Sequence, residues 1–367
     1  MTAADARHMV HALTLGRRGL GRVWPNPAVG CVIVLDGRVI GRGWTGDRGT
    51  PHAETRALAQ AGHAANGGTA YVSLEPCAHQ GRTPPCADAL VEAGLTRVVV
   101  PMEDPDDRVA GRGIERLRGA GITVDVGLLA GAAREAHAGF LMRVAKGRPF
   151  VTLKLAVALD GRIATAAGES RWITGKEARR VSHALRMSHD AVMVGAGTVR
   201  IDDPKLTVRG MGAVRQPVRI VVSGNQALSA RCRLTERLEE AGPVWLAHGQ
   251  ERGEDAAQWR LAGADLLPVP VSEGQVDIAS LMQKLGARGL TRVLCEGGGT
   301  LAASLLSAGL VDQLVVFSAG KVLGAEGKPS IGAVGVSQLS EAPEFEFMEQ
   351  RRFGTDIMHV WRRGNAD

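Results

Sequence analysis

A set of potential metal ligands, divided between two short segments, constrains this chain more than any other feature. His52 and Glu54 form a His-x-Glu pair, and Cys77 and Cys86 each follow a proline further along the chain. Zinc binds one imidazole and two thiolates tetrahedrally, which leaves a fourth position for water. Residues two apart on a helix do not share a face, so Glu54 should reach that water rather than the metal. The pattern predicts a zinc-activated water with a carboxylate beside it.

This combination is typical of zinc-dependent nucleobase deaminases, in which the glutamate moves protons between water and base. Both cysteines are expected near helix N-termini, where a depressed pKa favours the thiolate. A structural zinc is the alternative, with His79 as a fourth ligand that closes the site. Structural sites usually draw their ligands from close pairs, whereas eight residues separate Cys77 from Cys86. That spacing also departs from the Cys-x-x-Cys of most deaminases.

Length and composition suit two globular domains of an intracellular protein. The chain has 367 residues, 45% of them hydrophobic, which is enough for two cores. A formal charge of +6 favours an anionic ligand such as a phosphate and permits nucleic acid without demanding it. The five cysteines show no disulfide spacing, so we expect a reducing cytoplasm. Neither a signal peptide nor a membrane-spanning stretch is expected.

Strand and helix patterns alternate along the chain and predict an α/β fold with two domains, 1–147 and 148–367. The boundary falls at the Lys-Gly-Arg-Pro sequence of residues 146–149. In the first domain we expect helices at 3–15, 52–61, 86–93 and 114–118, and strands at 29–35, 39–44, 69–74, 97–100 and 122–126. Asp36-Gly37 between the first two strands is a strong hairpin signal. The cysteine segment follows a strand end, where such folds usually bind ligands.

The second domain has its own candidate ligand site. A strand at 292–295 leads into Glu296-Gly297-Gly298-Gly299-Thr300 and then a helix at 300–308. Glycines let the backbone approach a ligand, and a helix N-terminus attracts phosphate. The loop lacks the Gly-x-Gly-x-x-Gly pattern of Rossmann folds, and a plain glycine-rich turn is the alternative. Further strands are expected at 150–158, 191–194, 218–222, 244–247, 266–269 and 311–317, a hairpin at 345–360, and helices at 254–262, 277–288 and from a capping box at 174–177 to 188.

The motifs of both halves, in their order, resemble those of the RibD family, in which a pyrimidine deaminase is fused to a reductase of riboflavin biosynthesis. The wide cysteine spacing is that family's own form. The resemblance implies a cytidine-deaminase-like three-layer sandwich followed by a dihydrofolate-reductase-like domain. The matching segments are 26–34, 52–54, 75–86, 154–164, 168–174, 202–209 and 296–300.

The resemblance implies two successive reactions and two cofactors, zinc and NADPH. The first domain would release the 2-amino group of 2,5-diamino-6-(5-phospho-ribosylamino)pyrimidin-4-one as ammonia. The second would reduce the ribosyl group of 5-amino-6-(5-phosphoribosylamino)uracil to the ribityl product. The partner would be this phosphorylated pyrimidine, with neither nucleic acid nor membrane involved, and the chain would form a homo-oligomer.

The resemblance also assigns roles to individual residues. In the deaminase, His52, Cys77 and Cys86 would hold zinc and Glu54 would be the catalytic proton shuttle. Asn26 and Arg82 would contact the deaminase substrate. The forked guanidinium of Arg82 would pair with the phosphate oxygens of that substrate. In the reductase, the substrate residues would be Lys154, Ser170, Arg186, Leu206, Arg209 and Glu296. The NADPH residues would be Ala156, Trp172, Thr198, Asp202, Gly298, Gly299, Thr300, Leu301, Ala302, Ala303 and Ser304.

Two departures from the family pattern bear on these assignments. Asp106 stands where the family usually has asparagine, and its added carboxylate should repel an anionic substrate. Ser223-Gly224 stands where the family often has Asp-Ser, which removes one side chain expected to contact the cofactor. Three rival functions remain: a deaminase acting on nucleic acid, a non-catalytic zinc module beside a nucleotide-binding domain, and a chain in which one domain is inactive.

Overall fold

A computed structural model of the chain describes residues 1–80, 84–212, 214–224, 228–249 and 253–364. The chain divides into two compact units, Met1–Gly147 and Arg148–Asp367. Within the described ranges, none of the helices combines the length and the apolar character needed to cross a bilayer.

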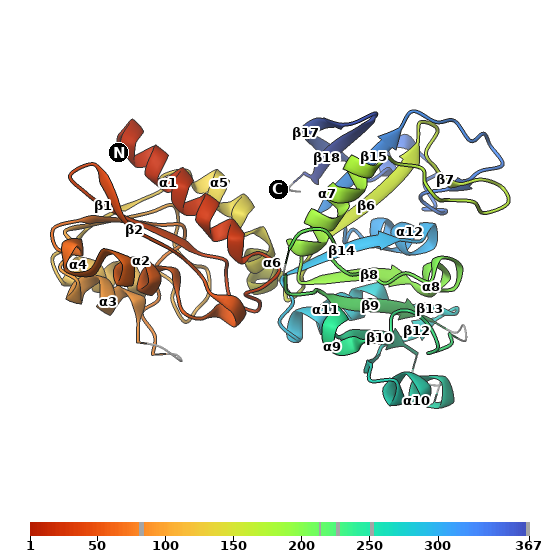
Figure 1. Ribbon diagram of the computed structural model, residues 1–367, viewed down its shortest axis with the longest axis horizontal. Helices are drawn as coiled ribbons and strands as arrows, with labels where there is room; N and C mark the ends of the chain where they lie inside the picture. Colours follow the sequence, from red (N-terminus) through yellow and green to blue (C-terminus); the bar gives the residue numbers. More distant parts are fainter. Residues whose placement is uncertain (81–83, 213, 225–227, 250–252, 365–367) are drawn as a thin grey trace. The chain divides into compact units, whose positions relative to one another are not determined.

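The first unit is built on a five-stranded sheet with strand order β2-β1-β3-β4-β5 (Figure 1). β1 is antiparallel to β2 and to β3, whereas β3, β4 and β5 are parallel to one another. The predicted hairpin between the first two strands is confirmed. The strands are β1 (Gly30–Leu35), β2 (Arg38–Trp44), β3 (Thr69–Val72), β4 (Arg97–Val100) and β5 (Thr123–Val126).

Helices cover both faces of this sheet, as the expected three-layer sandwich requires. Apolar residues of α1 (Ala3–Gly16) and α5 (Ala130–Ala136) share one core with the sheet. Those of α2 (Ala53–Ala61), α3 (Cys86–Glu92) and α4 (Arg112–Gly119) share the other core. Helices α5 and α6 (Ala138–Lys146) were not predicted from the sequence.

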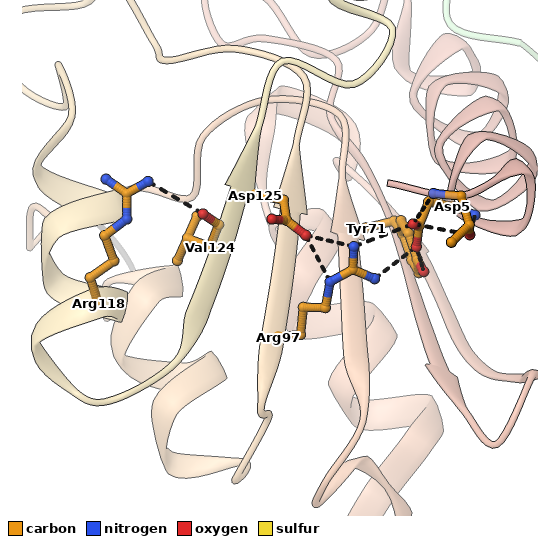
Figure 2. Close-up of polar contacts among 7 residues, drawn as sticks. Asp5, Tyr71, Arg97, Arg118, Val124 and Asp125 are labelled. Atoms are coloured by element: carbon orange, nitrogen blue, oxygen red, sulfur yellow. Dashed lines mark hydrogen bonds and ion pairs between the residues drawn. The ribbon is translucent and has the colours of Figure 1, made fainter.

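A partly buried polar network ties α1 to the sheet (Figure 2). Arg97 of β4 donates to Asp5 of α1 at 2.7 Å and to Asp125 of β5 at 2.5 Å. The Tyr71 hydroxyl donates to Asp5 at 2.7 Å, and the Asp5 side chain is only 5% exposed. The Asp5 carboxylate also accepts the backbone N–H of Thr2, which caps the helix. One carboxylate therefore fixes the start of α1 against two strands.

Replacing Asp5 with asparagine should lower the free energy of unfolding by about 2–4 kcal/mol, because Arg97 loses a buried partner. The hydrogen bond from Arg97 holds the pKa of Asp5 well below its usual value of 3.8. A depressed folded-state pKa stabilises the fold above the unfolded-state pKa, and this contribution disappears as the pH falls through the folded value. Urea unfolding at pH 7 and pH 3 should therefore show a smaller difference between wild type and variant at the lower pH. A difference that does not change with pH would contradict this account, and Asp125→Asn, at a partly exposed site, serves as the milder control.

The second unit contains a nine-stranded sheet with strand order β11-β10-β9-β8-β14-β6-β15-β18-β17 (Figure 1). The strands from β11 to β15 are parallel, and β18 and β17 complete the sheet as an antiparallel hairpin. The predicted C-terminal hairpin is confirmed. These strands are β6 (Phe150–Ala158), β8 (Ala191–Gly195), β9 (Val218–Ser223), β10 (Val244–His248), β11 (Asp265–Pro268), β14 (Arg292–Gly297), β15 (Gln313–Ala319), β17 (Phe345–Phe353) and β18 (Asp356–Arg363).

Two small two-stranded sheets accompany this large sheet. They pair β7 (Arg162–Ala164) with β16 (Lys328–Pro329), and β12 (Val271–Ser272) with β13 (Gln275–Val276). The helices of the unit are α7 (Lys176–Met187), α8 (Ala196–Asp202), α9 (Leu238–Ala241), α10 (Gly253–Leu261), α11 (Ile278–Ala287) and α12 (Gly299–Ser307).

The start of α7 corrects one expectation. The predicted capping box at 174–177 is wrong, because the N-cap is Gly175 and no side chain caps the helix. The Gly175 N–H instead donates to Asp356 of β18 at 2.6 Å. A partner nearly two hundred residues away thus replaces the local one. Helix α8 was also not predicted from the sequence.

Candidate functional site

Three of the predicted ligands lie together in the first unit. The ligand atoms of His52, Cys77 and Cys86 all lie within 4.8 Å of one another. His52 Nδ1 is 3.1 Å from the Cys86 sulfur and 3.6 Å from the Cys77 sulfur. Ligand atoms of a tetrahedral zinc are roughly 3.5–3.8 Å apart, as follows from Zn–N and Zn–S bonds of about 2.0 and 2.3 Å. The His52–Cys77 distance matches this spacing and the His52–Cys86 distance is slightly shorter, so the three residues could hold a zinc ion after a small adjustment.

The cluster of His52, Cys77 and Cys86 also tests the alternative of a structural zinc with four protein ligands. No fourth His, Cys, Asp or Glu joins the three residues in the described part of the chain, His79 included. A zinc ion held here would keep one position open, which is the arrangement of catalytic sites.

Local structure explains why the ligands face each other. His52 is the N-cap of α2, and its carbonyl accepts the Arg56 N–H at 3.2 Å. α2 packs directly on β2, where a Cβ added at Gly43 would lie 2.0 Å from the Ala53 carbonyl oxygen. Cys86 is the first residue of α3 as expected, whereas Cys77 lies in the loop after β3 rather than in a helix. The Cys77 sulfur is nevertheless next to a helix N-terminus, because it accepts the N–H of Cys86 at 3.4 Å.

Glu54 lies in the first turn of α2 beside this cluster and is only 4% exposed. Burial, followed by the nearby Cys77, raises its pKa to about 7. The hydrogen bond between the two thiols lowers the pKa of Cys77 and raises the pKa of Cys86. Cys77 is therefore the thiol of this pair that ionises more readily. The carboxylate can hold or release a proton near neutral pH, as acid–base catalysis needs.

Glu75 is a positioning residue that the sequence reading did not assign. Its buried carboxylate accepts the backbone N–H groups of Asp104, Gly111, Gly113 and Ile114 at 2.8–3.2 Å. A carboxylate just ahead of the cysteine segment therefore anchors the 104–114 loop through backbone contacts. No spacing in the sequence could indicate this, because the donors are backbone N–H groups 29 to 39 residues further along the chain.

The Asp106 departure has less effect than its charge suggests. Arg108 donates to the Asp106 carboxylate at 2.6 and 2.9 Å, so the added charge is paired within the loop. The strong repulsion of an anionic substrate expected from the sequence is therefore reduced. Asn26 is exposed and packs against Gly49, whereas Arg82 lies outside the described residues.

The second unit holds a large cavity of about 1310 Å³ at the ends of β6, β8 and β14. Most of the predicted reductase residues line it, but Ala302 and Ala303 do not: they are buried in α12. Consecutive residues of a helix point in different directions, so some side chains of α12 face the protein interior while their neighbours face the cavity. The prediction took every residue from Gly298 to Ser304 and ignored this alternation. The predicted residues that line the cavity are Lys154, Ala156, Ser170, Trp172, Arg186, Thr198, Asp202, Leu206, Arg209, Glu296, Gly298, Gly299, Thr300, Leu301 and Ser304.

A buried ion pair lies in this cavity. Arg186 of α7 donates to both oxygens of Glu296, at 2.5 and 2.9 Å, and both side chains are at most 14% exposed. Burial opposes ionisation, yet Arg186 lowers the pKa of Glu296 to about 2. Lys154 of β6 is close enough to feel both charges, and burial lowers its pKa. The cavity thus combines a fixed carboxylate with an ammonium that releases its proton more readily than usual.

Gly224, the second residue of the Ser223-Gly224 departure, packs tightly against the backbone of a neighbouring hairpin. A Cβ at Gly224 would lie 2.0 Å from the Gly274 carbonyl oxygen, so a side chain there does not fit. Gly274 and Gln275 belong to the β12–β13 hairpin, which lines the cavity beside Gly224. The Ser304 hydroxyl donates to Gln275 at 3.4 Å. Backbone and amide groups of this hairpin therefore occupy the place of the missing side chain.

Comparisons with known proteins match a different family to each of the two units. Residues 2–102 match the cytidine and deoxycytidylate deaminase zinc-binding region, and residues 149–359 match the RibD C-terminal domain. The riboflavin biosynthesis protein RibD of Escherichia coli K12 is 43% identical over 365 residues, covering 96% of this chain and 98% of the relative. The Aquifex aeolicus protein of the same name is 39% identical, covering 98% of each chain.

Solved structures of full-length relatives are also similar. Acinetobacter baumannii RibD superposes with a TM-score of 0.88 at 37% identity, covering 99% of both chains. A diaminohydroxyphosphoribosylaminopyrimidine deaminase/5-amino-6-(5-phosphoribosylamino)uracil reductase from Thermotoga maritima gives 0.87 at 34% identity, covering 98% of this chain and 99% of its own.

The fold and the sites define a bifunctional enzyme with a zinc-binding deaminase domain and a reductase domain. Both domains are present at nearly full length in the relatives. The chain belongs to the RibD family of riboflavin biosynthesis.

Proposed function

We propose that the first unit hydrolyses 2,5-diamino-6-(5-phospho-ribosylamino)pyrimidin-4-one to 5-amino-6-(5-phosphoribosylamino)uracil and ammonia. The second unit then reduces the ribosyl group of that product with NADPH. The observation that carries this proposal is the pairing, in one chain, of an open three-ligand site beside buried Glu54 with the Arg186–Glu296–Lys154 cavity. The name of the Thermotoga maritima relative states the same two activities.

In the deaminase, His52, Cys77 and Cys86 would hold zinc, which supplies an acidified water for attack on the amino-bearing carbon. Glu54 takes a proton from that water and delivers it to the departing amine, so water enters and ammonia leaves. Its burial and raised pKa suit both halves of this exchange.

In the reductase, NADPH supplies hydride to the ribosyl carbon, and the opening sugar ring gains a proton on oxygen. We assign the proton to Lys154, whose pKa burial lowers. Glu296, held by Arg186, orients the substrate. The lining residues Gly298, Gly299, Thr300, Leu301 and Ser304, together with the β12–β13 hairpin, would form the cofactor side of the cavity. The expectations that the chain forms a homo-oligomer and binds no nucleic acid remain part of this proposal.

Removing zinc tests the proposal directly. Protein treated with a chelator should lose ammonia release by at least ~100-fold, because water keeps its high pKa without the metal. It should still oxidise NADPH when given 5-amino-6-(5-phosphoribosylamino)uracil. Ammonia and NADPH absorbance would be recorded together, before and after zinc is restored. Full ammonia release from metal-free protein, or parallel loss of both activities, would overturn the assignment of two independent sites.

A further inference from the structure

Two arginines in the reductase cavity have no partner for their charge. Arg209 and Arg233 both line it, and in the described ranges neither guanidinium makes a hydrogen bond or ion pair. Arg186, a neighbouring arginine of the same cavity, is neutralised by Glu296. Asp203, the acidic neighbour of Arg233, is engaged with the backbone N–H of Arg233 at 2.8 Å. In the described residues, neither the Arg209 nor the Arg233 guanidinium is therefore held by a carboxylate.

The chain holds the backbones of these two residues in place. The Arg209 N–H donates to His183 Nδ1 at 3.3 Å, which ties it to α7. The bond to Asp203 ties Arg233 to the end of α8. The residue after Arg233, Leu234, is fully buried, and its carbonyl accepts the guanidinium of buried Arg219 at 2.8 Å. Two separate loops are thus anchored so that each brings an arginine to the cavity.

The positive charges of Arg209 and Arg233, on these two loops, repel each other. Burial, followed by the charges of Arg186 and Arg233, lowers the pKa of Arg209. Like charges kept close together without a counter-ion destabilise the empty site, and an anion between them removes that cost. A guanidinium fork matches the oxygens of a phosphate better than any other side chain does. The arrangement suits a phosphate monoester rather than a neutral group.

We propose that Arg233 forms, together with Arg209, the binding site for the phosphate of the reductase substrate. The inference rests on the proposed function and adds Arg233 to its substrate residues. A second phosphate monoester, the 2′-phosphate of NADPH, has the same chemistry. We assign the substrate phosphate because hydrogen bonds place Arg209 beside the Arg186–Glu296 pair assigned to the substrate. Arg186 donates to the Thr207 carbonyl at 2.9 Å, and the Arg209 N–H donates to His183 of the same helix as Arg186.

The test compares Arg233→Ala with Arg231→Ala in the full-length protein. Arg231 is exposed in the same loop and does not line the cavity, so it controls for the loss of one charge. Arg233→Ala should raise KM for 5-amino-6-(5-phosphoribosylamino)uracil about 10- to 100-fold, the effect of a lost charge-assisted hydrogen bond. KM for NADPH and KM for the dephosphorylated substrate should not change. Arg231→Ala should behave as wild type.

Each other outcome has a distinct meaning. A raised KM for NADPH alone would assign Arg233 to the cofactor phosphate, and equal losses with both substrates would exclude a phosphate role. Wild-type kinetics in Arg233→Ala would also overturn the inference. Failure of the proposed function is a separate result, since the wild type would then not oxidise NADPH with this substrate. If Arg233→Ala melts early, Arg233→Lys decides: it keeps the charge without the fork and should raise only the KM for the phosphorylated substrate.

Discussion

Glu54→Gln should lose ammonia release by about 10²–10⁴-fold, the usual contribution of a positioned general acid–base group. Glutamine has nearly the same shape but cannot take a proton from water or return it to the amine. Because Glu54 is buried beside the ligand cluster without belonging to it, the variant should still bind zinc. Ammonia release and zinc content would be measured on the same preparation.

The second activity provides the internal control for this variant. Glu54→Gln should oxidise NADPH at the wild-type rate once 5-amino-6-(5-phosphoribosylamino)uracil is supplied. Glu92→Gln, an exposed position at the end of α3, should affect neither activity. A zinc-loaded Glu54→Gln protein that still deaminates would remove Glu54 from the mechanism and favour the non-catalytic zinc module.

Glu296→Ala should destabilise the second unit by about 3–5 kcal/mol, since it leaves Arg186 buried without its partner. The Arg186–Glu296 pair is almost fully buried, so little water can replace the lost carboxylate. The rate of substrate reduction should also fall strongly, by a factor that corresponds to at least the same free energy. The reason is that Arg186 and Lys154 would both lose the neighbouring negative charge that orients them. Urea unfolding and NADPH oxidation with the deaminated substrate measure the two effects.

An exposed ion pair of the same unit gives the matched control for this change. Arg237 and Glu240 are paired at 3.2 Å, but both side chains are at least 70% exposed. Glu240→Ala should cost no more than about 1 kcal/mol, as is usual for surface pairs. Ammonia release should be unchanged in both variants. If Glu296→Ala were as stable as Glu240→Ala, the buried pair would not be the support that its geometry indicates.

Prediction from sequence succeeded where a local pattern encodes the structure. Alternating apolar runs placed β6, β14 and the C-terminal hairpin, since each buried strand contributes side chains at a fixed period. Prediction failed at Gly175, where Asp356 of another strand replaces the local cap. The placement of Cys77 was only partly correct, because the residue lies in a loop rather than in a helix, although its sulfur accepts the N–H of Cys86 at the start of α3.

The sequence by itself determined the family, the ligand set of His52, Cys77 and Cys86, and the glycine-rich loop after β14. These features occupy short segments whose spacing reflects their chemistry. Only the tertiary structure decided how Glu75 holds the 104–114 loop and how two loops bring Arg233 to the cavity of Arg209. Such contacts join backbone groups and loops that are distant along the chain. They depend on how buried elements pack, and no local residue pattern encodes that packing.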